Sequence, residues 1–239
     1  MRAKQPVQLF KTEWQRATEQ YASQLKDGVI FQLDKERVLE LMNRNPRECV
    51  LKLPTGKRGE VFELSLERSH ITARGFEVYT SDNRNIPFEY KGGLHFHGNV
   101  QGEDKSLVAV SVFEDEVMGL ISTTKGTYTL GKIGGAETEH VLYRYDDLID
   151  PPEFKCYTED DGKGYSQEEL YTTPRDAGDC TNIYVEADKS LFDNLGTVDA
   201  VVNLMLGSFN QSAVLYDNEM LTISVSEIFV WTTPDPYSG

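Results

Sequence analysis

Residues 180–239 constrain the fold of this chain most, because they combine two strand patterns with one long helix pattern. Residues 181–188 alternate apolar and polar side chains, which is the period of a strand. Thr197 is a suitable helix N-cap, and the apolar residues after it recur at helical spacing. They are Val198, Val201, Val202, Met205, Phe209, Ala213 and Tyr216. Residues 221–231 again have a strand pattern, so the order predicts a βαβ unit with two parallel strands.

A single βαβ unit cannot bury both faces of its strands. We therefore expect residues 180–239 to be the first βαβ unit of an incomplete α/β domain that continues beyond Gly239.

The N-terminal residues 1–48 are expected to be a helical segment. Apolar residues three or four positions apart indicate a helical stripe. They are Phe10, Trp14, Ala17 and Tyr21. Asp34 is a suitable N-cap for a second helix over residues 35–42.

From Cys49 onward the hydrophobic period changes to two. Residues 49–150 contain short strand-like segments separated by turn residues, which predicts an antiparallel sandwich or barrel. Residues 151–179 are rich in Asp, Glu, Gly and Tyr and show no period, so we expect an acidic linker there. The predicted fold class is α+β, with an antiparallel β-rich domain followed by the incomplete α/β unit.

The charge of the chain bears on its partners. A formal net charge of -15 argues against binding to nucleic acid or to anionic membrane surfaces, because both require a basic patch. No apolar run approaches the length of a membrane span. We therefore expect no nucleic acid partner and no membrane span.

Three stretches of the C-terminal region resemble the opening of the catalytic domain in secreted zinc metalloproteases of the adamalysin (reprolysin-like) type, a metzincin family, particularly its bacterial members. They are IYVEAD at 183–188, VDAVVNLMLGSFNQSAVLYDNE at 198–219 and ISVSEIFVWTTPDPYS at 223–238. Residues 49–133 resemble the propeptide of the same family, through GGLHFHGNVQGEDKSLVAVSVFEDEVMGLISTTKGTYTLGKI at 92–133.

The resemblance implies a function. The chain would be the N-terminal portion of a secreted zinc metalloendopeptidase zymogen, in which a β-rich propeptide inhibits its own downstream catalytic domain. It would comprise a propeptide-like domain and the start of a zincin-type catalytic domain. The full-length protein would bind zinc, act on protein substrates and be extracellular.

The family's catalytic motif is HExxHxxGxxH, in which three histidines hold zinc and the glutamate is a general base. This chain does not contain the motif, since none of its four histidines is followed by glutamate. We therefore expect no catalytic residue and no zinc ligand of the active enzyme here, and the chain alone should be inactive.

Two cysteines have open roles. The resemblance makes Cys156 a candidate thiolate ligand of the catalytic zinc in the zymogen, although Tyr157 follows it where the family's switch motif has glycine. Alternatively, Cys156 forms a disulfide with Cys180 or with a cysteine beyond Gly239. Arg175 is a candidate activation cleavage site, because proteolysis concentrates in exposed polar segments.

Two further interpretations concern a metal site and a non-catalytic role. His95 and His97 have the i, i+2 spacing of some metal sites, but no third ligand is evident, so we expect no metal there. The chain also fits a non-catalytic β-rich extracellular binding or inhibitory module, or a degenerate fragment without activity. The coding sequence beyond codon 239 distinguishes these from the protease precursor.

Overall fold

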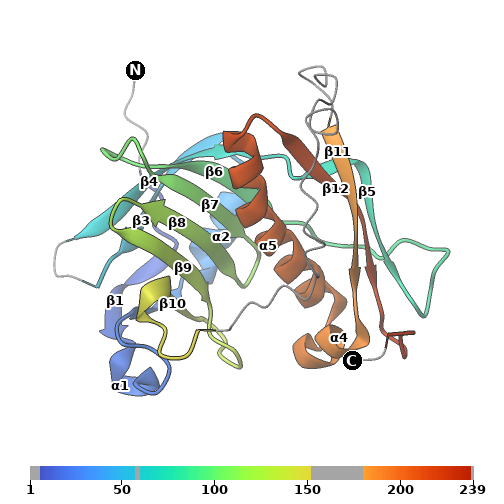
Figure 1. Cartoon of the computed structure of the whole chain (residues 1–239), viewed down its shortest axis with the longest axis horizontal. Coiled ribbons are helices and arrows are strands. Elements are labelled where there is room, and N and C mark those ends of the chain that lie inside the picture. Colours follow the sequence, from blue (N-terminus) through green and yellow to red (C-terminus); the bar gives the residue numbers. More distant parts are fainter. Residues whose placement is uncertain (1–5, 57–59, 152–179, 238–239) are drawn as a thin grey trace, which may run out of the picture.

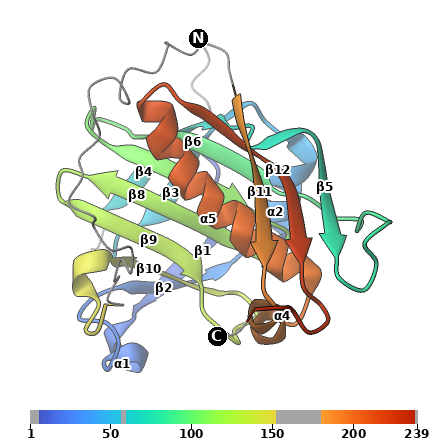
Figure 2. The same cartoon turned by 45° about the vertical axis from the view of Figure 1, so that its right-hand side comes forward.

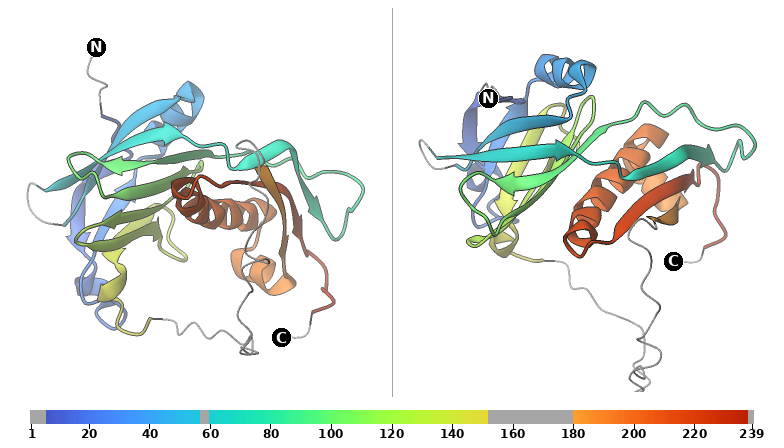
Figure 3. Two further views of the ribbon diagram at one scale, coloured as in Figure 1. Left: turned by 45° about the horizontal axis from the view of Figure 1, so that its top comes forward. Right: turned by 90° about the horizontal axis from the view of Figure 1, so that it is seen from above.

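The computed structural model describes residues 6–56, 60–151 and 180–237, which form two sheets with one long helix between them (Figure 1). The larger sheet is antiparallel and curled, as the two views of Figure 3 show. The smaller sheet has three parallel strands.

The nine strands of the large sheet are, in spatial order, β1 (Phe10–Arg16), β2 (Val29–Leu33), β10 (Glu139–Arg144), β9 (Gly126–Lys132), β8 (Val117–Thr123), β7 (Leu107–Val112), β6 (Leu94–Val100), β4 (Val61–Arg68) and β3 (Glu48–Pro54). The small sheet has the order β11 (Cys180–Ala187), β12 (Thr222–Val230) and β5 (Thr72–Thr80). The helical elements are α1 (Thr18–Tyr21), α2 (Lys35–Arg44), the 3-10 turn η1 (Tyr145–Asp147), α4 (Lys189–Leu195) and α5 (Val198–Asn218).

The main hydrophobic core lies on one face of the large sheet. It contains Phe96, Val110 and Ile121 from the central strands, and α2 adds Val38 and Leu41. The Asp34 side chain accepts a hydrogen bond from the Arg37 N–H at 3.3 Å, so the predicted N-cap is confirmed.

A second core lies between α5 and the small sheet. It includes Val202 and Leu206 from α5 and Val225 and Ile228 from β12. Thr197 caps α5 by accepting from the Ala200 N–H at 3.2 Å, as the sequence predicts. Strand β11 precedes α5 in the sequence and β12 follows it, and the two strands pair in parallel. The predicted strand–helix–strand order is therefore confirmed.

Strand β5 is the unexpected member of the small sheet. It lies between β4 and β6 in the sequence but leaves the large sheet and pairs in parallel with β12 (Figure 2). In this pairing Val78 stands opposite Ile228 and Tyr79 opposite Phe229. The small sheet is therefore built from both halves of the chain.

The predicted fold class, α+β with a separate incomplete α/β zincin-type start, is wrong. The described residues are mostly strand, with a curled nine-stranded antiparallel sheet and a small parallel sheet. The parallel sheet does not belong to the C-terminal region alone, because β5 supplies its third strand.

The predicted helical segment at the N-terminus is also partly wrong. Phe10 and Trp14 lie in β1, which pairs with β2 through a register shift between these two residues. A spacing of four residues places side chains on one face both in a helix and in a strand, so the pattern did not separate the two.

Candidate functional site

Helix α5 lies between the two sheets and contacts both (Figure 2). It presents different residues to each sheet. The predicted apolar stripe contributes to the core with the small sheet. Another face of α5 lies toward the large sheet and carries polar or small residues at helical spacing, together with the buried Val214. These polar or small residues, the polar stripe of α5, are Asn203, Gly207, Asn210 and Asp217. Buried polar groups need hydrogen-bond partners, so this stripe identifies the candidate site.

Asn210 lies in the middle of the contact between α5 and the large sheet and is fully buried. Its Nδ2 donates to the backbone oxygen of Val110 on β7 at 3.2 Å and to that of Phe96 on β6 at 3.5 Å. Its Oδ1 is buried and has no partner among the described residues. A buried unsatisfied acceptor costs about 1–3 kcal/mol. This cost offsets the stabilisation from the two hydrogen bonds, so the main effect of Asn210 is to fix the position of α5 on the large sheet.

His97 on β6 contacts α5 at two points. Its Nδ1 lies 2.7 Å from Oδ2 of Asp217, and its Nε2 lies 3.2 Å from the backbone oxygen of Asn210. The His97 side chain is only 14% exposed, while that of Asp217 is 50% exposed. The two contacts are about two helical turns apart on α5, so His97 fixes both the position and the direction of the helix.

His95 points to the same face of β6 but is enclosed. Its Nδ1 lies 2.9 Å from Oγ of Ser111, and its ring meets Phe113 edge to face. Burial lowers the pKa of His95 to about 3, with smaller contributions from Arg68 and His97, so its ring is neutral near pH 7. His95 is a satisfied core histidine.

Near the beginning of α5, Tyr90 makes a corresponding contact from the segment after β5. Its hydroxyl donates to Oδ1 of Asn203 at 2.7 Å. Burial, and then the nearby carboxylate of Asp199, raise the pKa of Tyr90. The phenol therefore stays protonated and serves as a permanent donor.

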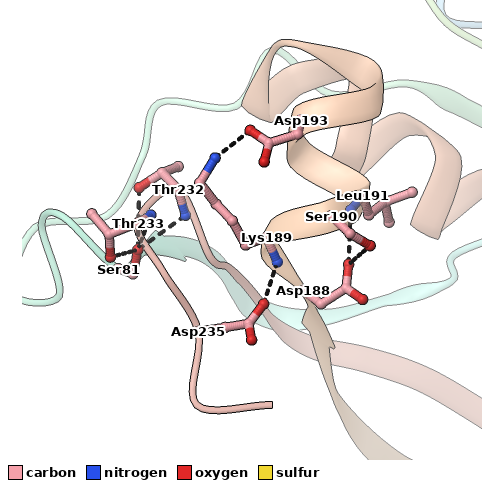
Figure 4. Close-up of polar contacts among 9 residues, drawn as sticks. All are labelled: Ser81, Asp188, Lys189, Ser190, Leu191, Asp193, Thr232, Thr233 and Asp235. Carbon is pink, nitrogen blue, oxygen red and sulfur yellow. Dashed lines mark hydrogen bonds and ion pairs between the residues drawn. The ribbon is translucent and has the colours of Figure 1, made fainter. Parts of the chain in front are cut away.

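The carboxyl ends of the parallel strands are tied together by a second polar cluster (Figure 4). Ser81, directly after β5, accepts through its Oγ from the backbone N–H groups of Thr232 at 3.0 Å and Thr233 at 2.9 Å. The Thr232 hydroxyl donates to Asp82 at 2.6 Å, and this hydrogen bond lowers the pKa of Asp82. These contacts connect the two halves of the chain where β5 and β12 end.

Further hydrogen bonds at this end of the small sheet hold α4 in place. Asp235 accepts from the Lys189 N–H at 2.7 Å, and Asp188 caps α4 by accepting from the Leu191 N–H at 2.8 Å (Figure 4). Because these groups bond to one another, we interpret the cluster as a structural tie.

A groove of about 1210 Å³ lies between β3, β4 and β6 and the C-terminal end of α5. Its polar lining includes Lys52, Glu63, Ser65, Glu67, His97 and Asp217. Helix α5 packs over strands β6 to β8 of the large sheet. The groove lies at the edge of the region that the helix covers.

The residues that the sequence analysis singled out are mostly not brought together. Cys156 and Arg175 lie outside the described residues, so the switch, disulfide and cleavage assignments stay predictions. Cys180 begins β11 and is exposed, with Sγ 3.1 Å from Oγ of Ser224. Cys49 is buried in β3 and belongs to the core of the large sheet.

The contacts of α5 with the large sheet were not predicted from the sequence. A signal was present for part of them, since the polar and small residues of α5 share one face. Nothing local to Tyr90 or Ser81 indicates a partner more than a hundred residues away.

The zinc ion that the resemblance implies finds no ligand set in the described part of the chain. No group of three or more His, Cys, Asp or Glu side chains is placed there to hold a metal. His95 is hydrogen-bonded to Ser111, and both ring nitrogens of His97 lie against acceptor oxygens of α5. The residues present do not fit a zinc site. Among the same residues, no helix has the length and apolar character needed to cross a membrane.

Comparison with known proteins gives weak likenesses only. No protein-family model matches the chain, and no curated protein is similar to it. A solved structure of a chaperone–substrate complex is 10% identical with a TM-score of 0.38, covering 63% of this chain and 99% of that chain. The crystal structure of metalloproteinase-II from Bacteroides fragilis is 11% identical with a TM-score of 0.44, covering 85% of this chain. The chain spans 58% of that metalloproteinase. At these identities and scores, neither structure assigns an activity or a partner to this chain.

Proposed function

We propose that this chain belongs to the precursor of a secreted zinc metalloendopeptidase of the adamalysin type. In this proposal residues 6–151 act as the propeptide, and they hold residues 180–237 in a folded and inactive arrangement. The family assignment rests on the sequence resemblance, and the role of the two halves rests on how they contact each other.

The observation that carries the proposal is that the N-terminal half supplies β5 to the sheet of the C-terminal half. Strand addition is a recurrent way for one protein segment to hold another through main-chain hydrogen bonds. Without β5, the small sheet would keep only β11 and β12 and would lose Val78 from its core. A two-stranded sheet is marginal on its own, so the N-terminal half would act as a folding aid.

The polar stripe of α5 supports a separable contact. Interfaces between parts that move apart are more polar than permanent ones. Asn210 and Asp217 are hydrogen-bonded to the large sheet, and Asn203 is hydrogen-bonded to Tyr90 in the segment after β5. The side of α5 toward the small sheet is apolar. Release of the propeptide would therefore expose polar side chains that water can solvate.

Zinc, protein substrates and an extracellular location enter the proposal through the resemblance. Since the described residues do not fit a zinc site, the proposal places zinc on a motif HExxHxxGxxH encoded beyond codon 239. Cys156 as a zymogen zinc ligand or disulfide partner of Cys180, and Arg175 as the cleavage site, belong to the same proposal. Reading the coding sequence tests this part, and a stop codon after codon 239 would contradict the protease.

Limited proteolysis tests the relation between the halves. We expect the first cut between residues 151 and 179 and expect the two fragments to remain together on size-exclusion chromatography. The variant Val78→Asp places a charge in the core between β5 and α5, and its fragments should separate. Glu77→Gln, on the other face of β5, is the matched control and should leave them together. First cleavage inside residues 94–133 would count against the proposal.

A second candidate function is a β-rich extracellular binding or inhibitory module, and the groove beside α5 is the observation that favours it. A permanent module has no need to separate, so its fragments should stay associated after linker cleavage even when Val78→Asp is present. The same chromatography therefore distinguishes the two functions.

A further inference from the structure

Within the part of the chain that the structure describes, the small sheet is covered on one face only. Helix α5 and the second core lie on that face, as Figure 3 shows. The other face, which we call the outer face, is lined by alternate residues of the three strands. They are Tyr184 and Glu186 from β11, Glu227 and Phe229 from β12, and Glu77 and Tyr79 from β5. Parallel sheets are normally covered on both faces, so the outer face is a candidate interaction surface.

An aromatic cluster at the edge of the outer face already holds a cation. The guanidinium carbon of Arg84 lies 5.0 Å from the ring centre of Phe229 and 4.8 Å from that of Trp231. The two rings meet edge to face, with their centres 5.3 Å apart. Both guanidinium distances are within the range of a cation–π contact, about 6 Å. Arg84 forms no ion pair with a described residue, so the two rings are its principal contacts.

Glu186 supplies a negative charge beside this cluster. Its Oε1 accepts from the Trp231 indole N–H and from the Tyr237 hydroxyl, the latter at 2.6 Å, and its Oε2 accepts from the Tyr184 hydroxyl at 3.3 Å. The hydrogen bonds from Tyr237 and Trp231 lower the pKa of Glu186, and the charge of Arg84 adds to this effect. The cluster therefore combines ring faces with an ionised carboxylate, which is the chemistry that recognises a guanidinium group.

The same residue types recur in the next row of the outer face, where no described cation forms an ion pair. Tyr184 is 51% exposed and stands opposite Glu227, which in turn stands opposite Glu77. Glu77 accepts from the Tyr79 hydroxyl at 2.7 Å, whereas the Glu227 carboxylate forms no hydrogen bond or ion pair with a described residue. Like charges directly opposite each other in a sheet are destabilising. A cation from outside the chain would relieve this repulsion.

We propose that the outer face of the small sheet is a docking surface for an arginine-bearing segment of a partner protein. An arginine of this segment stacks on the exposed ring of Tyr184 and pairs with Glu227 and Glu77. The guanidinium group suits this row because it is flat and always charged, so it can stack on a ring and bond to carboxylates at once. The net charge of -15 also attracts a basic partner from a distance.

The docking surface combines both halves of the chain. Glu77 comes from the N-terminal half, and Tyr184 and Glu227 come from the C-terminal half. Binding therefore requires the pairing of β5 with β12, but it does not rest on the proposed function. If the proposed function also holds, the partner recognises the precursor before its halves separate. A stop codon after codon 239 would remove that role and leave the binding unchanged.

The docking surface is tested by fluorescence anisotropy, using the intact chain and a short fluorescein-labelled peptide in which arginine alternates with serine. We expect this peptide to bind. The same peptide with citrulline in place of arginine keeps the shape of the side chains but loses their charge, and we expect it not to bind.

Two variants that remove the same charge separate the docking surface from the net charge of the chain. Glu227→Gln should raise the dissociation constant of the arginine peptide about tenfold, the effect of losing one charged hydrogen-bond partner. Glu40→Gln, at an exposed position of α2 on the large sheet, is the matched control and should leave the dissociation constant as it is in the parent. Tyr184→Ala removes the exposed ring and should weaken binding about threefold or more.

Equal dissociation constants for Glu227→Gln and Glu40→Gln would overturn the docking surface, because the peptide would then respond to net charge alone. Equal binding of the citrulline and arginine peptides, or no binding of the arginine peptide to the parent, would overturn it as well. If Glu227→Gln does not fold, Tyr184→Ala decides in its place, and an unchanged dissociation constant for that variant would overturn the docking surface.

Discussion

Gly98 on β6 is required by the close approach of β4. A methyl group added at Gly98 would lie 1.9 Å from the carbonyl oxygen of Ser65, a backbone atom of the paired strand that cannot turn away. We expect Gly98→Ala to lower the free energy of unfolding by about 1–3 kcal/mol, measured by urea denaturation. Gly131→Ala is the matched control, since a methyl group on that part of β9 meets nothing within 4 Å. Equal losses for the two variants would show that the contact with β4 is unimportant.

Two buried histidines contribute to how the stability of the chain responds to acid. Burial lowers the pKa of His140 to about 4 and that of His95 to about 3. The unfolded chain protonates both near pH 6.5, so their contribution is complete above that pH and is lost as the pH falls toward 4. For His140 this amounts to at most about 3 kcal/mol.

The measurement is the free energy of unfolding in urea at neutral pH and near pH 4.5. His140→Gln retains a donor and an acceptor for Thr138 and Val117 but cannot titrate, so it should lose less stability in acid than the parent. His70→Gln, at an exposed histidine, should lose as much as the parent. If His140→Gln loses as much stability in acid as the parent does, His140 is not a source of that loss.

At the residue scale, sequence predicts the features that depend on near neighbours. The N-caps Asp34 and Thr197 were predicted because a cap bonds to an N–H only a few residues away. The partners of His97 and Asn210 were not predicted, because they lie a hundred or more positions away in the sequence. Their pairing depends on where α5 meets the sheet, and no local pattern encodes that.

At the element scale, α5 approaches the large sheet closely because Gly207 has no side chain. An added methyl group there would lie 2.5 Å from Sδ of Met118 on β8. Gly207→Ala should therefore destabilise α5 unless the methionine moves or is shortened. The double variant Gly207→Ala/Met118→Ala should recover part of the loss, and a double-mutant cycle in urea measures the coupling. Additive losses would mean that α5 and β8 are not in direct contact.

The sequence predicts whether an element is a helix or a strand where its hydrophobic period is unambiguous. It does not predict which elements pair with one another. Strands β11 and β12 and helix α5 were recognised because each has a long, regular apolar pattern. Strand β5 was expected only as one of the short strand-like segments within residues 49–150, without its partner. Its side chains alternate equally well on an antiparallel or a parallel neighbour, so pairing with β12 cannot be read from the sequence.

At the scale of the whole molecule, the two hydrophobic cores differ in how far they depend on each other. The core on the large sheet is made entirely from residues 9–142. The core beneath α5 combines Ile71 and Val78 from the N-terminal half with residues of the C-terminal half. The sheet face that α5 covers carries the small or polar residues Ala109 and Ser111 and also the apolar Met118, which packs against α5 at Gly207. Because the core of the curled sheet contains no residue of α5, we expect this sheet to fold without α5. The core of the small sheet includes Ile71 and Val78, so we expect the small sheet to need the N-terminal half.

This asymmetry predicts how paired core variants behave. Leu64→Ala in the first core and Leu206→Ala in the second each remove the same buried side chain, at a cost of about 2–5 kcal/mol. Trp14 packs on the first core, and Trp231 lies beside Phe229 at the end of β12, so single-tryptophan forms report on each part. Leu206→Ala should shift the urea transition of Trp231 and leave that of Trp14 in place. Leu64→Ala should shift both, because the small sheet depends on β5 being held by the curled sheet. Equal shifts of both reporters with Leu206→Ala would instead mean that the chain unfolds as one cooperative unit, and the two halves would then not be separable.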